Sequence, residues 1–453
     1  MKTKLSLAVA SALLASASAA NAGIMIPAGD WTLDIGGIVN TYYTHTNFSG
    51  DTGAGTAPLG LGDGSGHSIS NITTGLLPNY LSVSGKTRQN DLDVGFTISI
   101  NPGSSTTSAG KQSAQQENRQ AFLTFGDKSW GSIKIGKDLG IFASDAILND
   151  MTLLGVGSGA GSLAGNTTTL GRIGTGFMYA DWKAQVAYSS PNWNGFSFTA
   201  GVTQAWDAVG TLGGVGSSGR GGSSPAFEGK ASYEWAGDVG GQVWVSGMTQ
   251  RVKGLGATGA RGFSIAAVRT GPGPIAFTTD TIGTAAATGG TDDRATAFDI
   301  GTTVNLAGFG LTGYYYKGSG IGQTLQLNGG FDARGNNRDS DGYYVQATYT
   351  LPGVGTKLGL SYGRSTLDGN GVDGFKDLKD DMWTIGAYHP ITKHLNLVAE
   401  YSETEHKLDN KASAGSAYVN NGFQPDTAFS APSAGGSRDG KAKTISLGAI
   451  LFF

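Results

Sequence analysis

The chain has 453 residues, no cysteine and a formal charge of −3, and it combines 76 glycines with only 14% charged residues. The lack of cysteine excludes disulfides and thiolate metal sites, and the lack of a basic run argues against a nucleic-acid partner. Glycine this frequent with so few charges is unusual for a soluble globular protein. No segment approaches 18 consecutive apolar residues, which excludes a helical membrane protein.

The first 22 residues have the pattern of a secretory signal peptide. Lys2 and Lys4 form a charged start, Leu5 to Leu14 is apolar, and Ala20-Asn21-Ala22 is a small-residue cleavage site. We therefore predict that residues 1–22 are cleaved and that residues 23–453 form one exported domain.

After the leader, short segments alternate between apolar and polar residues, which is typical of strands whose two faces differ. Clear examples in chain order are Asp91 to Ile100, Gly342 to Leu351 and Leu395 to Ser402. The last segment places Ile445, Leu447, Ala449, Leu451 and Phe453 on one face and Thr444, Ser446 and Gly448 on the other. Similar segments start near Trp31, Tyr80, Arg119, Ser132, Lys183, Phe196, Glu228, Gln242, Phe263, Phe298, Leu311, Lys357 and Met382.

These segments are roughly ten residues long, the length that a tilted strand needs to cross a bilayer. In lipid every backbone N–H and C=O must be paired, so a sheet spans a membrane only when it closes on itself. The sequence therefore predicts an all-β transmembrane antiparallel barrel of about sixteen strands. Eighteen strands stay open at this point, because the irregular tract Arg251–Arg294 has room for two more.

The connections alternate between short and long, as in outer-membrane barrels. Short turns are predicted near residues 126–129, 191–194, 236–238 and 390–393, and the long loops are expected to face the cell exterior. The long loops are Phe48 to Leu77, Asp138 to Gly171, Trp206 to Ala226, Gly318 to Ser340 and Lys407 to Lys441. Aromatic residues such as Trp235 and Trp383 fall near predicted strand ends, which favours interfacial girdles.

Several segments resemble the general (non-specific) trimeric porins of Gram-negative bacteria. Residues 119–125 and 131–137, ending in Gly136-Lys137, are similar to the fourth and fifth strands of that family. Residues 188–196 are similar to the hairpin between strands six and seven, and the strand ending in Phe453 resembles the family's assembly signal. The matches cover roughly the N-terminal half of the mature chain and its last strand.

The resemblance implies a homotrimer in the outer membrane, whose third extracellular loop folds into each pore. Residues 138–171 match that loop, and they contribute Asp145, Asp150 and the glycine-rich run from Gly155 to Gly165. In the family, loop carboxylates face a ladder of basic side chains on the wall, and the resulting transverse field favours polar solutes. Arg119 and Lys137 fall at matching places in the ladder.

This chain departs from the ladder elsewhere. Ile38, Tyr80 and Ser189 stand where the family often has basic residues, and Lys86 and Lys134 are the candidates to substitute from neighbouring heights. The strand phase also points Arg119 toward lipid unless a bulge intervenes or the residue lies at the rim. We therefore expect a weaker transverse field and mild charge selectivity. Lys230 is a further residue expected to face the lumen, since a charge facing lipid is costly.

The expected function is passive diffusion of ions and small hydrophilic solutes, without catalytic, cofactor or metal site. The five histidines lack metal-site spacing, and no G-x-S-x-G elbow occurs. The expected partners are outer-membrane lipid and lipopolysaccharide, two further copies of the chain, and the assembly machinery through Phe453. Two alternatives stay open here: an eighteen-stranded solute-specific channel, such as one for saccharides, and a plugged barrel that acts as a receptor, adhesin or hydrolase.

Overall fold

The computed structural model describes residues 23–50, 68–104, 116–158, 168–206, 208, 224–255, 291–332, 335–371, 373, 375–410 and 437–453. The predicted signal peptide, His67 and most of the tract between Arg251 and Arg294 lie outside these residues. The described strands are β1 (Ile24–Ala28), β2 (Trp31–Gly50), β3 (Ser68–Thr73), β4 (Tyr80–Gln89), β5 (Leu92–Pro102), β6 (Gln116–Glu117), β7 (Ala121–Asp127), β8 (Gly131–Leu139), β9 (Trp182–Ser189), β10 (Phe196–Thr203), β11 (Ala226–Trp235), β12 (Val239–Leu255), β13 (Thr291–Leu306), β14 (Phe309–Ser319), β15 (Asp339–Thr350), β16 (Lys357–Asp368), β17 (Phe375–Pro390), β18 (Leu395–Asn410) and β19 (Ser437–Phe452). Two short helices, α2 (Ser144–Leu148) and η2 (Met151–Leu154), follow β8.

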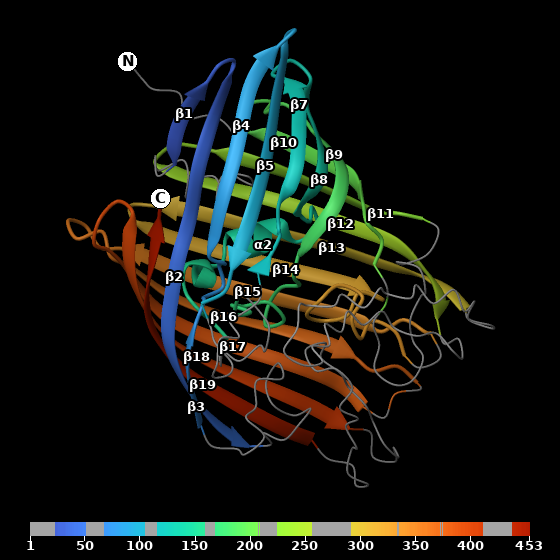
Figure 1. Ribbon diagram of the computed structural model, residues 1–453. Coiled ribbons are helices and arrows are strands. Elements are labelled where there is room, and N and C mark those ends of the chain that lie inside the picture. Colours follow the sequence, from blue (N-terminus) through green and yellow to red (C-terminus); the bar gives the residue numbers. More distant parts are fainter. Residues whose placement is uncertain are drawn as a thin grey trace, which may run out of the picture.

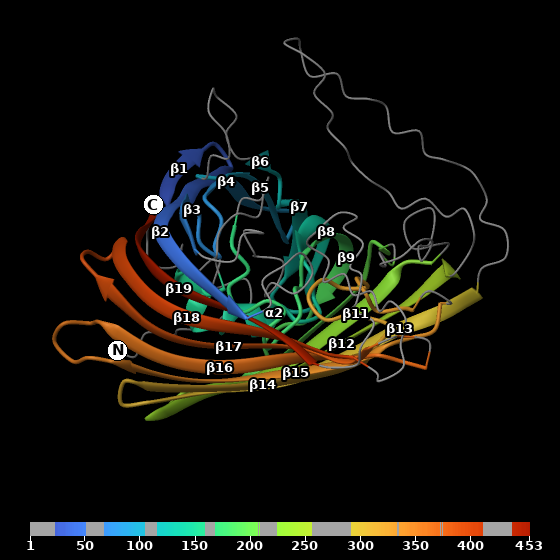
Figure 2. The same cartoon turned by 90° about the horizontal axis from the view of Figure 1, so that it is seen from below.

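The strands form one closed antiparallel ring (Figures 1 and 2). β3 and β4 both pair with β2 and are two parts of one strand, and β6 and β7 both pair with β5 in the same way. β1 and β19 pair with successive parts of β2, so together they supply one strand. The ring therefore has sixteen strands, which confirms the predicted barrel and shows that the eighteen-stranded alternative is wrong.

The ring closes where β1 and β19 meet on β2. Ile24 of β1 pairs with Ile35. Two residues further along β2, the N–H of Gly37 donates to the carbonyl of Phe453 (2.8 Å), and the N–H of Phe453 donates to the carbonyl of Gly37 (3.0 Å). Backbone hydrogen bonds thus close the seam, as a barrel in lipid requires.

The outer face of the ring is apolar. Alternate residues point outward, and these include Val39, Ile98, Leu123, Val186, Val245, Ile300, Leu311, Val345, Leu360, Ile385 and Leu447, all exposed. Aromatic pairs border this band on both sides. Those near the short turns are Trp193–Phe196, Tyr233–Trp235 and Phe309–Tyr349, and those nearer the long loops are Phe298–Tyr315, Tyr343–Tyr362 and Trp383–Tyr401. This is the arrangement of a barrel surrounded by lipid, with Trp235 and Trp383 in the two aromatic rows.

The wall is low on one side of the barrel and tall on the other (Figure 1). β7 to β10 have 7 to 9 residues each, whereas β17, β18 and β19 have 16. The chain leaves the low wall after β8 and turns into the barrel, where α2 is visible in Figure 1. None of the helices in the described residues is long and apolar enough to cross a membrane.

Candidate pore constriction

The connection between β8 and β9 (residues 140–181) is called the third loop here. Its described residues, 140–158 and 168–181, lie inside the ring. Its apolar side chains pack against aromatic residues of the wall: Phe142, Ile147 and Phe177 share a buried cluster with Tyr314 and Tyr344. A loop with this many buried apolar residues is held by the same burial that stabilises a protein core.

Glu228 of β11 anchors the start of the third loop. Its Oε2 accepts hydrogen bonds from the backbone N–H groups of Ile141 (2.8 Å) and Phe142 (2.9 Å). Its Oε1 accepts from Lys183 Nζ at 2.5 Å and from the Thr203 hydroxyl at 3.0 Å. This buried carboxylate is therefore fully used in binding the loop and a lysine, and it is not free to act on solutes.

Glu400 of β18 anchors the far part of the loop from the opposite wall. Its Oε2 accepts from the N–H groups of Val156 (2.7 Å) and Gly157 (2.9 Å), and its Oε1 accepts from the Tyr388 hydroxyl at 2.6 Å. Between the two anchors, Gln346 of β15 accepts from the N–H of Met151 at 2.6 Å. The loop is thus tied to three separated strands of the wall.

The two predicted loop carboxylates have different environments. Asp145 lies at the start of α2 and is bonded to Lys230 Nζ of β11 at 2.9 Å. Asp150 caps η2 by accepting from the N–H of Thr152 at 3.1 Å, and its side chain is fully buried 3.7 Å from Arg172. Burial raises the pKa of Asp150 and lowers the pKa of Arg172, because both charged forms are removed from water. Asp150 thus supports the loop from within and does not line an open cavity.

Arg172 is a second internal support of the loop. Its guanidinium donates to the carbonyl of Met382 in β17 at 2.9 Å and to the hydroxyl of Ser361 in β16. A buried arginine with carbonyl, hydroxyl and carboxylate partners fixes the return limb of the loop against the tall wall.

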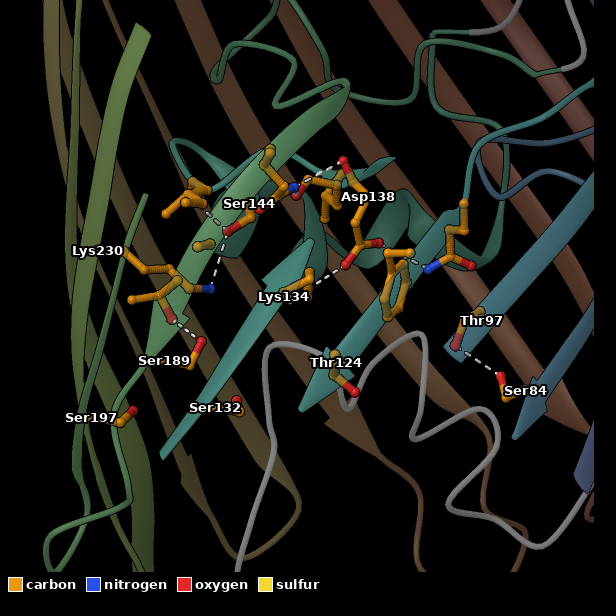
Figure 3. Close-up of a pocket in the computed structure, with 18 of the residues that line it drawn as sticks. Ser84, Thr97, Thr124, Ser132, Lys134, Asp138, Ser144, Ser189, Ser197 and Lys230 are labelled. Atoms are coloured by element: carbon orange, nitrogen blue, oxygen red, sulfur yellow. Dashed lines mark hydrogen bonds and ion pairs between the residues drawn. The ribbon is translucent and has the colours of Figure 1, made fainter. Parts of the chain in front are cut away.

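A cavity of about 500 Å³, the lower chamber, lies between the third loop and the low wall (Figure 3). Hydroxyl side chains dominate its wall, and several bond one another across neighbouring strands. These pairs are Ser84–Thr97 (3.0 Å), Ser189–Thr199 (2.9 Å) and Ser197–Ser232 (3.3 Å). Such a surface offers hydrogen bonds to polar solutes without a strong net field.

Both lysines in the lower chamber are paired with carboxylates. Lys134 forms an ion pair with Asp138, and Gln120 donates to the other oxygen of Asp138 at 3.0 Å. Figure 3 shows Lys134 and Asp138 on the wall and Lys230 reaching toward Ser144 of α2, to which it donates at 3.1 Å. Each lysine of the chamber therefore has a carboxylate neighbour within ion-pair distance.

A second cavity of about 400 Å³, the upper chamber, is built from the adjoining parts of the same low wall. Its lining comprises residues just before β4 and β7 and the long-loop ends of β8 and β9. On β8 and β9, Lys137 and Trp182 share the strand phase of Ile135 and Val186, which point outward. It is lined by Leu76, Leu77, Pro78, Glu117, Asn118, Arg119, Lys137, Leu139, Ile147, Leu148, Leu153, Thr168, Thr169, Leu170, Ile173, Tyr179, Asp181, Trp182 and Leu325. Ser144 of α2 contacts the lower chamber while Ile147 and Leu148 contact the upper one, so α2 separates the two.

The predicted site residues are divided between these environments. Tyr80 and Lys134 line the lower chamber, and Arg119 and Lys137 line the upper one. Lys86 lies on β4 in the same phase as Ser82 and Ser84 of the lower chamber, near the short turn after Gln89, and it is exposed. The structure therefore does not bring the seven predicted residues, Tyr80, Lys86, Arg119, Lys134, Lys137, Asp145 and Asp150, together at one height.

Arg119 escapes the lipid-facing phase because it is not in a strand. The strand is interrupted between β6, which ends at Glu117, and β7, which begins at Ala121. The Arg119 side chain is buried, forms an ion pair with Glu117 at 2.8 Å and lies over the ring of Trp182. Lys137 remains exposed and donates to the carbonyl of Asn118 at 2.7 Å. Of the residues noted as departures from the basic ladder, Ile38 is buried inside the barrel, and Ser189 lines the lower chamber.

Four charged residues important for the constriction were not among the predicted site residues. Glu228, Glu400, Lys183 and Arg172 hold the loop, and their signal in the sequence is weak. Three of these four residues are charged residues at lumen-facing positions of strands. Charged residues are common at such positions in any pore wall, so the sequence does not single these three out. In the described part of the chain, no cluster of His, Asp and Glu is placed to hold a metal.

The comparisons with known proteins identify the family. The family model described as Gram-negative porin matches residues 8–410. The fold is similar to that of the outer membrane channel DcaP of Acinetobacter baumannii (TM-score 0.60, 15% identity, covering 95% of this chain and 100% of that one). It is also similar to an anion-selective porin from Comamonas acidovorans (TM-score 0.53, 16% identity, covering 93% of this chain and 100% of that one). A further similar structure is Salmonella typhi OmpF in complex with daunomycin (TM-score 0.51, 15% identity, covering 94% of this chain and 100% of that one).

No curated protein matches the sequence. The family match spans most of the chain, and the closed ring with its apolar outer face is the architecture that this family requires. Family and fold indicate a channel. The chain belongs to the Gram-negative porin family and forms a passive diffusion channel in the outer membrane.

Proposed function

We propose that this porin passes small, hydrophilic solutes with only mild discrimination between cations and anions. The observation that carries the proposal is the local pairing of charges along the pore. Lys134 faces Asp138, Lys230 faces Asp145 and Arg119 faces Glu117, so each of these three basic groups is neutralised by a nearby carboxylate. Charges paired at this distance leave a small field for a passing ion.

The remaining imbalance in the lower chamber is small and negative. Its lining contains three carboxylates, Asp34, Asp138 and Glu234, and two lysines, Lys134 and Lys230. With Asp145, the partner of Lys230, the count is four carboxylates to two lysines. In the upper chamber Arg119 is paired with Glu117, whereas Lys137 is in the outward strand phase of Ile135. We therefore expect a weak preference for cations, unlike the anion selectivity stated for the Comamonas relative.

The test is the reversal potential of single channels in a planar bilayer under a salt gradient. We expect a potassium-to-chloride permeability ratio above one and below about five, because paired charges focus little potential in the pore. A ratio below one, or above about ten, would contradict the pairing argument. A folded barrel that conducts nothing would instead favour a plugged receptor or adhesin.

We further propose that the porin assembles as a homotrimer through its low wall, surrounded elsewhere by lipid and lipopolysaccharide. The low wall at β7 to β10 is too short to shield the third loop from the outside, and its outer face carries Leu123, Ile135 and Val186. A second and third copy would cover this side. Chemical cross-linking in native outer membranes would give a ladder ending at three subunits, whereas a single band would reject the trimer.

Phe453 is proposed as the contact for the outer-membrane assembly machinery. It is the last residue of the chain as given, and it closes the ring against Gly37. Recognition of this end by the machinery would couple delivery of the chain to formation of the seam.

A further inference from the structure

A second connection also enters the barrel, in addition to the third loop. It links β14 to β15 and was expected to face the cell exterior, but its side chains are buried. Ile321 is 0%, Leu327 1% and Phe331 2% exposed. Glycine and asparagine make this segment resemble a solvent-exposed loop in the sequence, whereas its apolar residues are removed from water in the structure.

One side of this connection is bonded to the third loop and to the low wall. The N–H of Tyr179 donates to the carbonyl of Thr324 (3.0 Å), and the amide of Gln326 donates to the carbonyl of Tyr179 (3.1 Å). The Gln326 oxygen accepts from Lys183 Nζ of β9 at 2.6 Å. Lys183 is buried and also binds Glu228, so the same lysine ties this connection to an anchor of the third loop.

The other side is bonded to the tall wall. The amide of Gln323 donates to the carbonyl of Ser365 in β16 at 2.8 Å. At the base of the connection, Arg338 forms a two-bond ion pair with Asp373 (2.6 and 2.8 Å) and lies over the ring of Phe375. The segment is thus held at both ends and at its base by buried or half-buried polar contacts.

These contacts place the segment across the lumen. β9 and β16 are seven strands apart in the ring of sixteen, so they lie on nearly opposite walls. Gln323 reaches β16 and Gln326 reaches β9, which means that four successive residues span the gap between the walls. Figure 2, which looks along the barrel, shows this gold-to-orange connection inside the ring of strands.

The segment lies on the side of the third loop that faces the long connections. Lys183 precedes Gln185, Ala187 and Ser189 of the lower chamber on β9, and Leu325 lines the upper chamber. A solute coming from the long-loop side therefore meets this segment before it reaches α2 and the lower chamber.

We propose that residues 320–332 form a crossbar that acts as a second, size-selective filter in series with the third loop. This inference rests on the proposed diffusion path through both chambers. Because the crossbar is fixed by Gln323, Gln326 and Arg338, it restricts the cross-section permanently and does not open and close. The exclusion limit of the channel is then set by the crossbar and the third loop together.

The test is a variant that lacks the crossbar but keeps the strands. Gly320 and Gly330 lie side by side, since a Cβ on Gly330 would be 2.2 Å from the Gly320 carbonyl oxygen, so residues 321–329 can be replaced by Gly-Ser. If the two filters contribute similar resistances in series, single-channel conductance rises about twofold. Liposome swelling should then also show faster uptake of a trisaccharide, with little change for a pentose.

Folding of the variant is checked by its heat-dependent shift in electrophoretic mobility, which reports an intact barrel. A folded variant with unchanged conductance and unchanged sugar cut-off would overturn the proposal. If the protein is not a diffusion channel at all, the outcome is different, because the unmodified protein then conducts nothing.

A cross-link gives an independent test of position. The chain has no cysteine, so a disulfide between Tyr179→Cys and Leu325→Cys, which are paired in a β-bridge, reports only this contact. We expect the disulfide to form under mild oxidation and the conductance of this variant to be the same before and after oxidation. Failure to cross-link in the folded protein, or a large drop in conductance on oxidation, would reject a fixed crossbar.

Discussion

The Glu400 carboxylate gives the sharpest test of how firmly the third loop is held. Glu400→Ala removes hydrogen bonds from two backbone N–H groups and from the Tyr388 hydroxyl. Bonds to a charged acceptor contribute about 1.5–3 kcal/mol each, and water in the pore replaces part of this, so we expect a loss of about 4 kcal/mol in local stability. Every 1.4 kcal/mol is a factor of ten, so local opening becomes roughly a thousandfold more frequent.

Hydrogen exchange measures this opening directly. In the folded protein the amides of Val156 and Gly157 should exchange about a thousandfold faster in Glu400→Ala than in the parent, because exchange follows the population of the open form. Glu400→Gln keeps one acceptor oxygen and should show an intermediate effect. Single-channel recordings of Glu400→Ala should show more open-channel noise, since a less restrained loop samples more positions in the pore.

The matched control lies three residues further along β18. Glu403 has the same side chain, but it lies on the opposite face of the strand from Glu400 and pairs with Lys443 of β19 at 3.9 Å. Glu403→Gln should leave exchange at Val156 and Gly157 unchanged. If the two amides stay equally protected in Glu400→Ala, the carboxylate is not the anchor and the reasoning is refuted.

Three other variants test the remaining contacts. Lys230→Gln leaves Asp145 unpaired and should raise the preference for cations in reversal-potential measurements, whereas Asp145→Asn should lower it; equal shifts in one direction would contradict the pairing. Arg172→Met leaves Asp150 buried without its basic neighbour and should lower the free energy of unfolding by about 3–5 kcal/mol. Gels run after heating should then show loss of the folded form at a lower temperature, and the double variant that adds Asp150→Asn should recover part of the difference. Phe453→Ala should reduce the amount of folded barrel in the outer membrane much more than Phe452→Ala, and equal reductions would exclude a special role for the last residue.

The strand pattern was predictable because each strand separates lipid from lumen. Ile445 and Leu447 share the outer face as predicted, and both are exposed on the ring. The period of two follows directly from the pleat, so alternation alone was sufficient to predict the barrel and its outward face.

The details of the constriction were less accessible because they depend on contacts between distant residues. Val156 is 244 residues from Glu400, and Gln326 is 143 from Lys183. Local pattern does not encode such pairings, so the inward fold of residues 320–332 could not be predicted and Asp150 was expected in the eyelet. Arg119 shows a related limit, since the break between β6 and β7 decides its direction and leaves no clear mark in the sequence.

The seam between β1 and β19 has a practical consequence for engineering this barrel. Because β1 and β19 occupy one edge of β2, Gly23 and Phe453 lie close to the same residue, Gly36. A short linker could join them and make the backbone a continuous loop, with new ends opened in one of the long connections. Such a circular permutant would place an affinity tag or a fused domain on the outer side of the cell and leave the seam covalently sealed.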